Sequence, residues 1–305
     1  MKNTFFIVCL LLCMSLVPAA RAELVDDTIS DSENTDFSQK RTAASVPEDP
    51  ENNAQTLDAL FSINQPYLKN LSAYRPMYFL VGTDPEKSKF QFSIKYRIFS
   101  LDTPEPEEYR WKQNLYIAYT QTSFWNLQAS SQPFDDTSYK PEFFFLTRNF
   151  YFKKPSGSRL FFQTGYQHES NGQGEDLSRS TNTLYVQPIY VFYHSRTRLG
   201  VMISPRLMTY IVNDDDNTRN LSDYRGYADF EIKAGRADRL TMGTHLRAAK
   251  KGASVEVDLT YPLDKILSNK LNIYIQAQYV NALAESLMNY TKRTRAVRLG
   301  FAIVR

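Results

Sequence analysis

Cysteine is scarce in this sequence, because the 305 residues contain only Cys9 and Cys13, and both lie in the first apolar segment. Long apolar runs are scarce as well, since only that one is found, and the mean hydropathy is −0.44. A bundle of membrane helices needs repeated runs of about 20 apolar residues, so that class is excluded. Disorder throughout is excluded too, because 20 Tyr, 20 Phe and 2 Trp carry too much apolar surface to leave in water. A soluble globular protein and a transmembrane β-barrel, whose alternating strands give a modest average hydropathy, remain.

The first 22 residues have the three parts of a secretory signal peptide. Lys2 provides the positive start, Phe5–Leu16 is an apolar stretch of the usual length, and Ala20–Ala22 forms a cleavage site of the A-x-A type. We therefore expect residues 1–22 to be removed and Glu23 to begin the mature chain. Export would carry the chain into an oxidising compartment with no cysteine left for a disulfide. Its stability must then come from another source, and a closed hydrogen-bonded barrel would suffice.

Residues 23–56 differ in composition from the rest of the chain. They carry nine acidic residues against two basic ones, Lys40 and Arg41, with little apolar surface to pack. This composition predicts a flexible acidic arm in the periplasm. The chain as a whole carries a net charge of +3, so the remainder is basic. An exported chain seldom meets nucleic acid, and anionic lipid headgroups or lipopolysaccharide are therefore the expected partners.

From Tyr74 onward the sequence is a series of strand-like segments rich in Tyr, Phe, Val, Ile and Thr, separated by turn residues. Twelve such segments are found: Tyr74–Thr83, Lys87–Ser100, Gln113–Trp125, Pro141–Phe152, Ser158–Ser170, Ser180–His194, Arg198–Asn213, Tyr224–Arg236, Arg239–Lys250, Ala253–Leu263, Lys270–Leu283 and Lys292–Arg305. Several alternate between apolar and polar residues with a period of two. An even number of such strands predicts an all-β fold, a twelve-stranded antiparallel transmembrane β-barrel over residues 57–305.

The connections between these segments vary in length. Short ones such as Asp84–Glu86 and Ser195–Thr197 interleave with long polar ones such as Leu101–Lys112 and Gln128–Lys140. This pattern favours short periplasmic turns and longer extracellular loops. A periplasmic β-sandwich is the alternative, but the strands recur at membrane-spanning length and no disulfide is available. One departure is that such barrels usually end in an aromatic residue, whereas this sequence ends in Arg305.

A histidine and a serine lie two residues apart at the end of the fifth predicted strand. Residues two apart in a strand share a face, so His168 and Ser170 point the same way. The positions that precede them on this face include Phe162 and Tyr166, which suit the lipid side. The opposite face suits a polar lumen, with Gln163, Gln167 and Glu169. We therefore expect the histidine and the serine on the outer wall of the barrel, near its rim.

Asn182 lies on the corresponding face of the next predicted strand, in step with the apolar residues Leu184 and Val186. If the two strands pair as neighbours, Asn182 lies beside His168. The three side chains would then suit ester hydrolysis, with Ser170 attacking the carbonyl and His168 taking its proton and returning it to the leaving alcohol. Asn182 would accept from the far ring nitrogen and hold the ring. The alternative is a chance group of polar rim residues.

The stretch His168-Glu169-Ser170-Asn171-Gly172, followed by Ser178-Arg179-Ser180 and Asn182, closely resembles the outer membrane phospholipase A family. Tyr119-Thr120-Gln121 with Ser123 and Trp125, and Glu285-Ser286-Leu287 with Tyr290, resemble other parts of that family. The resemblance covers roughly residues 58–305. It implies a twelve-stranded barrel whose outer wall carries a His/Ser/Asn triad, here His168, Ser170 and Asn182.

The resemblance also implies a cofactor and an oligomeric state. Members of the family are calcium-dependent lipases that hydrolyse the sn-1 and sn-2 acyl esters of phospholipids and lysophospholipids, inactive as monomers and active as homodimers. Calcium would bind the side chain of Ser178, the main-chain carbonyl of Gln173 and a carbonyl of Ser131 of the partner subunit. The family usually has arginine where Gln173 stands, but a main-chain contact survives that change. Oxygen ligands suit Ca²⁺, and a cation near the oxyanion would compensate for a weak Asn.

Gln121 is expected at the dimer interface. Gln121 is on the same face of its predicted strand as Leu115, Ile117 and Tyr119, which are apolar and expected to point outward. Its side chain would therefore be a lone amide facing hydrocarbon. An unsatisfied amide is costly there, and a partner across the dimer would relieve the cost, as a matching glutamine does in the family. The alternative is an amide near the membrane interface that contacts headgroups or water.

The sequence thus predicts a calcium-dependent phospholipase of the bacterial outer membrane, regulated by reversible dimerisation. A small channel or a lipid-binding structural barrel with a vestigial triad is the second hypothesis, and a soluble periplasmic esterase is the third. His194 and His245 are interpreted as ordinary polar residues of a strand end or of the lumen.

Overall fold

The computed structural model describes residues 69–84, 87–99, 106–131, 133–147, 157–211, 218, 220–267 and 271–305. The predicted signal peptide, 1–22, and the predicted acidic arm, 23–56, lie outside the described residues. Of the helices in the described part of the chain, none combines the length and the apolar character needed to cross a membrane.

The thirteen strands of the described residues form a single sheet. They are β1 (Leu71–Ala73), β2 (Met77–Gly82), β3 (Ser88–Arg97), β4 (Leu115–Trp125), β5 (Phe134–Leu146), β6 (Ser158–Ser170), β7 (Ser180–His194), β8 (Leu199–Ile211), β9 (Ala228–Gly235), β10 (Thr241–Ala249), β11 (Gly252–Pro262), β12 (Tyr274–Leu283) and β13 (Arg293–Val304). In the described part of the chain, four short helices lie between these strands: η3 (Glu107–Asn114), η4 (Glu175–Leu177), α3 (Leu221–Arg225) and α4 (Asp264–Leu267).

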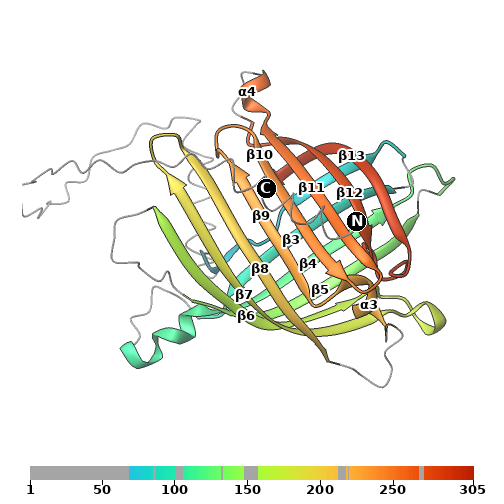
Figure 1. Ribbon diagram of the computed structural model, residues 1–305, viewed down its shortest axis with the longest axis horizontal. Helices are drawn as coiled ribbons and strands as arrows, with labels where there is room; N and C mark the ends of the chain where they lie inside the picture. The colour runs from blue at the N-terminus through green and yellow to red at the C-terminus, as the bar shows by residue number, and fades with distance from the viewer. Residues whose placement is uncertain are drawn as a thin grey trace, which may run out of the picture. The chain divides into compact units, whose positions relative to one another are not determined.

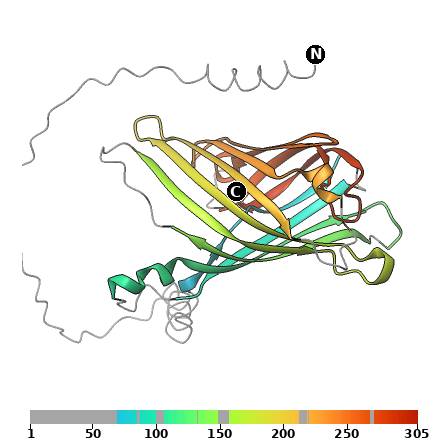
Figure 2. The same ribbon diagram turned by 60° about the horizontal axis from the view of Figure 1, so that its bottom comes forward.

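The sheet closes on itself as a barrel (Figures 1 and 2). From β2 to β13 each strand pairs antiparallel with its neighbour in the chain, and β13 pairs with β2 to complete the ring. The short strand β1 pairs with the same strand as β2, namely β3, so β1 and β2 are two halves of one interrupted strand. Pro76 lies in the interruption, where its missing N–H breaks no ladder bond. These pairings confirm the predicted all-β class and the closed twelve-stranded antiparallel barrel.

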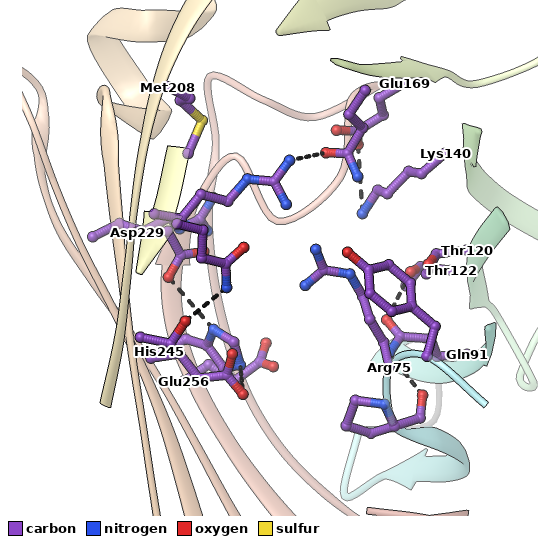
Figure 3. Close-up of a pocket in the computed structure, with 18 of the residues that line it drawn as sticks. Arg75, Gln91, Thr120, Thr122, Lys140, Glu169, Met208, Asp229, His245 and Glu256 are labelled. Atoms are coloured by element: carbon purple, nitrogen blue, oxygen red, sulfur yellow. Dashed lines mark hydrogen bonds and ion pairs between the residues drawn. The ribbon is translucent and has the colours of Figure 1, made fainter. Parts of the chain in front are cut away.

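Side chains alternate between an apolar outer wall and a polar lumen. In β13, Leu299, Phe301 and Ile303 are exposed on the outside, whereas Arg298, next to Leu299 in the strand, is 1% exposed and faces inward. The lumen holds a cavity of about 450 Å³ (Figure 3). The three residues predicted for the lumen, Gln163, Gln167 and Glu169, all line it. His245 lines it too, with its Nδ1 atom 3.4 Å from a carboxylate oxygen of Asp229.

Two strands have bounds that match the prediction at both ends, β6 and β7, whereas β5 differs. β5 was predicted to begin at Pro141 but begins at Phe134, and the added residues pair with β4. Most of them are polar, which is typical of a loop, but polar side chains among them have partners in the barrel: the Ser138 hydroxyl donates to Glu169, and Asp136 accepts from the backbone of Met288.

Short and long connections between strands occur at both ends of the barrel. Because strand directions alternate, the long connection after β3 lies at the same end as the short turn after β7, and the short turn after β2 lies at the opposite end. Connection length alone therefore does not distinguish the two ends. We call the end at which β6 finishes, with Ser170, the site end.

Buried charged side chains form a network across the lumen at the site end. Arg298 donates to both carboxylate oxygens of Glu285, at 2.7 and 3.1 Å, and Lys89 contacts Glu285 at 3.3 Å and Glu256 at 3.2 Å. Burial alone would raise the pKa of Glu285, which lies in the connection after β12, but Lys89 and Arg298 outweigh it and hold this pKa at about 2. The carboxylate therefore stabilises the fold at all pH values above its unfolded pKa, and this contribution falls as the pH approaches 2.

We predict that Arg298→Gln lowers the free energy of unfolding by about 3 kcal/mol, because it leaves a buried carboxylate without its bidentate partner. Urea unfolding in detergent micelles, followed by tryptophan fluorescence, measures the change. Arg236→Gln is the matched control, since Arg236 pairs with Asp238 on an exposed turn, and it should leave the unfolding midpoint in place. Equal midpoints for wild type and Arg298→Gln would contradict the prediction.

Candidate active site

Strands β6 and β7 bring His168 and Asn182 together. The two residues are directly opposite each other in the antiparallel ladder. The Nδ1 atom of His168 lies 2.8 Å from the Oδ1 atom of Asn182. An amide oxygen only accepts, so this contact places a proton on Nδ1 and leaves Nε2 as the basic nitrogen of the ring. This geometry would suit a base and a group that orients it.

His168 and Ser170 face the outside of the barrel. Phe162, on the same face of β6, is 43% exposed, and Leu184, in step with Asn182 on β7, is 47% exposed. Glu169, between the histidine and the serine, faces the lumen and is 4% exposed. The candidate site therefore lies on the apolar wall.

Ser170 is half-buried at the last position of β6, opposite Ser180 of β7. Within the described residues, no hydrogen bond joins Ser170 to His168 in this structure. Contacts between a nucleophile and its base are often long without substrate and tighten when it binds. The structure thus brings His168 and Asn182 into contact and leaves Ser170 two residues away on the same face.

Glu169 anchors this part of β6 from the lumen side. One of its oxygens accepts from Arg225 Nη1 at 2.6 Å, and the other accepts from the Ser138 hydroxyl at 2.9 Å and lies 3.7 Å from Lys140 Nζ. Figure 3 shows Glu169 and Lys140 on one side of the cavity and Asp229 and His245 on the other. No sequence pattern indicated Arg225, which comes from α3, a helix between β8 and β9.

One buried side chain, that of Asn171, joins the two ends of the connection from β6 to β7. It is 2% exposed. Its amide nitrogen donates to the Leu177 carbonyl at 2.9 Å, and its oxygen accepts from the backbone N–H of Arg179 at 2.9 Å. Gly172 follows with a φ of +68°, and a Cβ there would lie 2.7 Å from the ring of Tyr139. The loop is therefore folded tightly against the end of the barrel.

Two of the predicted calcium ligands, Gln173 and Ser178, lie in this loop, and Ser131 is exposed in the connection from β4 to β5 at the same end. Their oxygen donors are of the type that Ca²⁺ takes, but two donors from one chain fall short of the six to eight ligands that it needs. A site would need oxygens from water or a second chain. In addition, Arg179 donates to the Ser178 carbonyl at 2.7 Å, which places a positive charge beside the loop.

Among the residues that the structure describes, no group of three or more histidine, cysteine, aspartate and glutamate side chains is arranged to hold a metal ion.

The amide of Gln121 has partners within its own strand. Its oxygen accepts from the Tyr119 hydroxyl at 3.0 Å, and its nitrogen donates to Ser123 Oγ at 3.3 Å. The expected unsatisfied amide is thus not found, because residues two positions away on the same face reach it. A role for Gln121 at a dimer interface must therefore rest on other grounds.

An apolar groove of about 440 Å³ runs along the outer wall to His168. Strands β3 to β6 line it, with Ile94, Ile117, Tyr119, Phe143, Tyr166 and His168 among the lining residues. The sequence alone does not indicate this groove, because the groove forms only when four strands lie side by side.

Taken together, the fold and the side chains define a closed barrel of the outer-membrane type that carries a serine, a histidine and an asparagine on its outer wall. A model of the phospholipase A1 family matches residues 60–303. The chain belongs to the phospholipase A1 family.

Curated relatives are similar over part of their length. A protein of Neisseria meningitidis is 27% identical over 224 residues, 70% of this chain and 53% of the relative. Phospholipase A1 of Escherichia coli K12 is 27% identical over 186 residues, 60% of each chain. The chain thus spans between about half and three fifths of the relatives that it matches.

Solved structures share the fold. Outer membrane phospholipase A of E. coli matches with a TM-score of 0.62 and 24% identity, over 77% of this chain and 91% of that one. A structure of the E. coli protein with an active-site asparagine replaced by alanine matches with a TM-score of 0.61 and 23% identity, over 77% of this chain and 91% of that one. The Salmonella typhi protein, solved as a dimer with bound calcium, matches with a TM-score of 0.62 and 23% identity, over 77% and 92%.

We predict that Gly172→Ala destabilises the β6–β7 connection by about 1–3 kcal/mol, because alanine is strained at positive φ and its methyl group would collide with Tyr139. Gly174→Ala is the matched control in the same loop, since a Cβ there meets nothing within 4 Å. Thermal unfolding and limited proteolysis in detergent compare the two variants. Equal behaviour of both would contradict the account of this loop.

Proposed function

We propose that the protein is a calcium-dependent phospholipase of the bacterial outer membrane that hydrolyses sn-1 and sn-2 acyl esters of phospholipids and lysophospholipids. The observation that carries the proposal is the contact between His168 and Asn182 on the lipid-facing wall, with Ser170 on the same face. A hydrolytic site in that position is of no use for water-soluble substrates, but it meets lipids that lie in the same leaflet. Family membership supports the reaction class.

The reaction proceeds in two halves. Ser170 Oγ attacks the ester carbonyl while His168 Nε2 takes the hydroxyl proton, and the ester C–O bond then breaks as the ring returns the proton to the leaving alcohol. A water molecule, deprotonated by the same nitrogen, then attacks the acyl-serine carbonyl. The bond between the acyl group and Ser170 Oγ breaks, His168 returns the proton to Oγ, and the fatty acid is released. Asn182 Oδ1 accepts from Nδ1–H throughout, which keeps Nε2 directed to the chemistry.

The apolar groove on the outer wall is the proposed place for an acyl chain. His168 lies on the last of the four strands that line it, so a chain lying along Tyr119 and Phe143 would bring its ester to the histidine. Because the groove is open to the bilayer, a lipid would enter it sideways without leaving the hydrocarbon. This placement supports a membrane phospholipid as the substrate.

Calcium would be held by Ser178 Oγ, the Gln173 carbonyl and Ser131 of the partner subunit. The bound cation would stabilise negative charge on the ester oxygen in the transition state. The shortage of ligands in one chain supports completion by a second chain, and the Salmonella typhi relative was solved as a dimer with bound calcium.

Dimerisation would activate the enzyme, and the monomer would be inactive because its calcium site is incomplete. Gln121 is proposed at this interface. An amide can donate twice and accept twice, and within the described residues Gln121 uses one donor and one acceptor site, with Tyr119 and Ser123. The remaining capacity suits an equivalent glutamine across a two-fold axis.

Ser170→Ala is predicted to abolish acyl release from mixed phospholipid–detergent micelles while the barrel stays folded. Removing a nucleophile of this kind costs a factor of about 10⁶ in turnover. Ser158→Ala is the matched control, since Ser158 lies on the same face at the other end of β6, and it should keep full activity. Wild-type turnover in Ser170→Ala would refute the assignment, and no release by a folded wild-type dimer would favour a vestigial triad.

Calcium dependence is tested separately with excess chelator and with Ser178→Ala. Chelator should abolish acyl release, and the variant should need about tenfold more calcium or more, since loss of a ligand costs at least as much as loss of an outer-shell partner. Ser158→Ala should keep the wild-type calcium requirement. Full activity in chelator, or an unchanged calcium titration in Ser178→Ala, would contradict the proposed metal site.

A further inference from the structure

Tyr166 makes a second contact with the group that orients the histidine. It lies on the outer face of β6, two residues before His168, and its hydroxyl donates to Asn182 Oδ1 at 2.5 Å. The same oxygen is 2.8 Å from His168 Nδ1. Two donors therefore converge on one amide oxygen, and Asn182 itself is 5% exposed.

The orientation of this amide decides whether His168 can act as a base. The oxygen and the nitrogen of an asparagine side chain have nearly the same shape, so a half-turn exchanges them. With the oxygen toward the ring, the proton lies on Nδ1 and Nε2 is basic. With the nitrogen toward the ring, Nδ1 must accept, the proton moves to Nε2, and the ring cannot take a proton from Ser170.

The tyrosine hydroxyl favours the productive orientation. A separation of 2.5 Å falls within the range of O–H···O hydrogen bonds and is shorter than N–H···O bonds, so Tyr166 suits the oxygen of Asn182 and not its nitrogen. If the amide turned, the phenolic hydrogen would lose its acceptor on an apolar wall, where an unpaired polar group is costly. An aspartate at this position would have two equivalent oxygens and would not need such a contact.

We propose that Tyr166 is a positioning residue that fixes the amide of Asn182 and, through it, the protonation of the His168 ring. This inference rests on the proposed hydrolytic function. The ring of Tyr166 also lines the groove beside His168, so Tyr166→Phe removes the hydroxyl and keeps the wall of the groove.

The test is a double-mutant cycle between Tyr166→Phe and Asn182→Asp, with kcat and KM measured on phospholipid–detergent micelles. Tyr166→Phe should lower kcat about tenfold in the wild-type background, the size expected for one lost hydrogen bond, with KM unchanged. In the Asn182→Asp background the same change should cost less than about twofold, because a carboxylate has no wrong orientation. Equal losses in both backgrounds, or no loss in either, would overturn the inference.

A second readout does not depend on activity. The ¹⁵N shifts of the His168 ring, assigned by their absence in His168→Ala and measured where the ring is neutral, report which nitrogen carries the proton. Wild type should show the Nδ1–H form and Tyr166→Phe a mixture, whereas an unchanged single form would overturn the inference. Tyr190→Phe is the matched control, since its hydroxyl donates to Ser158 at the other end of the wall, and it should change neither readout.

The two readouts separate the two claims. If Ser170→Ala hydrolyses as fast as wild type, the proposed function fails, and the ring spectra still decide the role of Tyr166. If hydrolysis needs Ser170 but Tyr166→Phe changes neither kcat nor the spectra, the inference alone fails.

Discussion

Closure of the hydrogen-bonded ring is the constraint on which the rest of this structure depends. An unpaired backbone group in hydrocarbon costs several kcal/mol, and the pairing of β13 with β2 leaves the sheet without an edge. Once the ring is closed, each strand residue faces either the outer wall or the lumen. The apolar wall, the charged lumen and the position of the candidate site all follow from that alternation.

The same alternation lets one short piece of β6 serve both sides of the barrel. His168 and Ser170 face outward, and Glu169 between them reaches the lumen, where Arg225 holds it at 2.6 Å. A barrel has no second layer behind its wall to support a site, so the lumen network supplies that support from within. The proposed substrate is a lipid of the membrane that surrounds the barrel. Such a lipid need only move along the outer wall to reach His168.

Much of this was predictable from the sequence, and the remainder depends on contacts between distant segments. The bounds of β6 and β7, and the faces of His168, Ser170 and Asn182, follow from a period of two and from the turn residues between the strands. β5 was predicted to start too late, because Asp136 and its neighbours have the composition of a loop and yet find partners in the barrel, such as the Met288 backbone. The outer groove and the anchor from α3 need several strands in place, so no single segment signals them.

Covalent labelling of the nucleophile is the direct test of whether His168 activates Ser170. An alkyl fluorophosphonate reacts with a serine that a neighbouring base activates, and mass spectrometry of the digested protein locates the adduct. We expect one adduct, on Ser170, that requires His168 and is lost in His168→Ala. An adduct on another residue, or undiminished labelling of Ser170 in His168→Ala, would contradict a serine activated by this histidine on the outer wall.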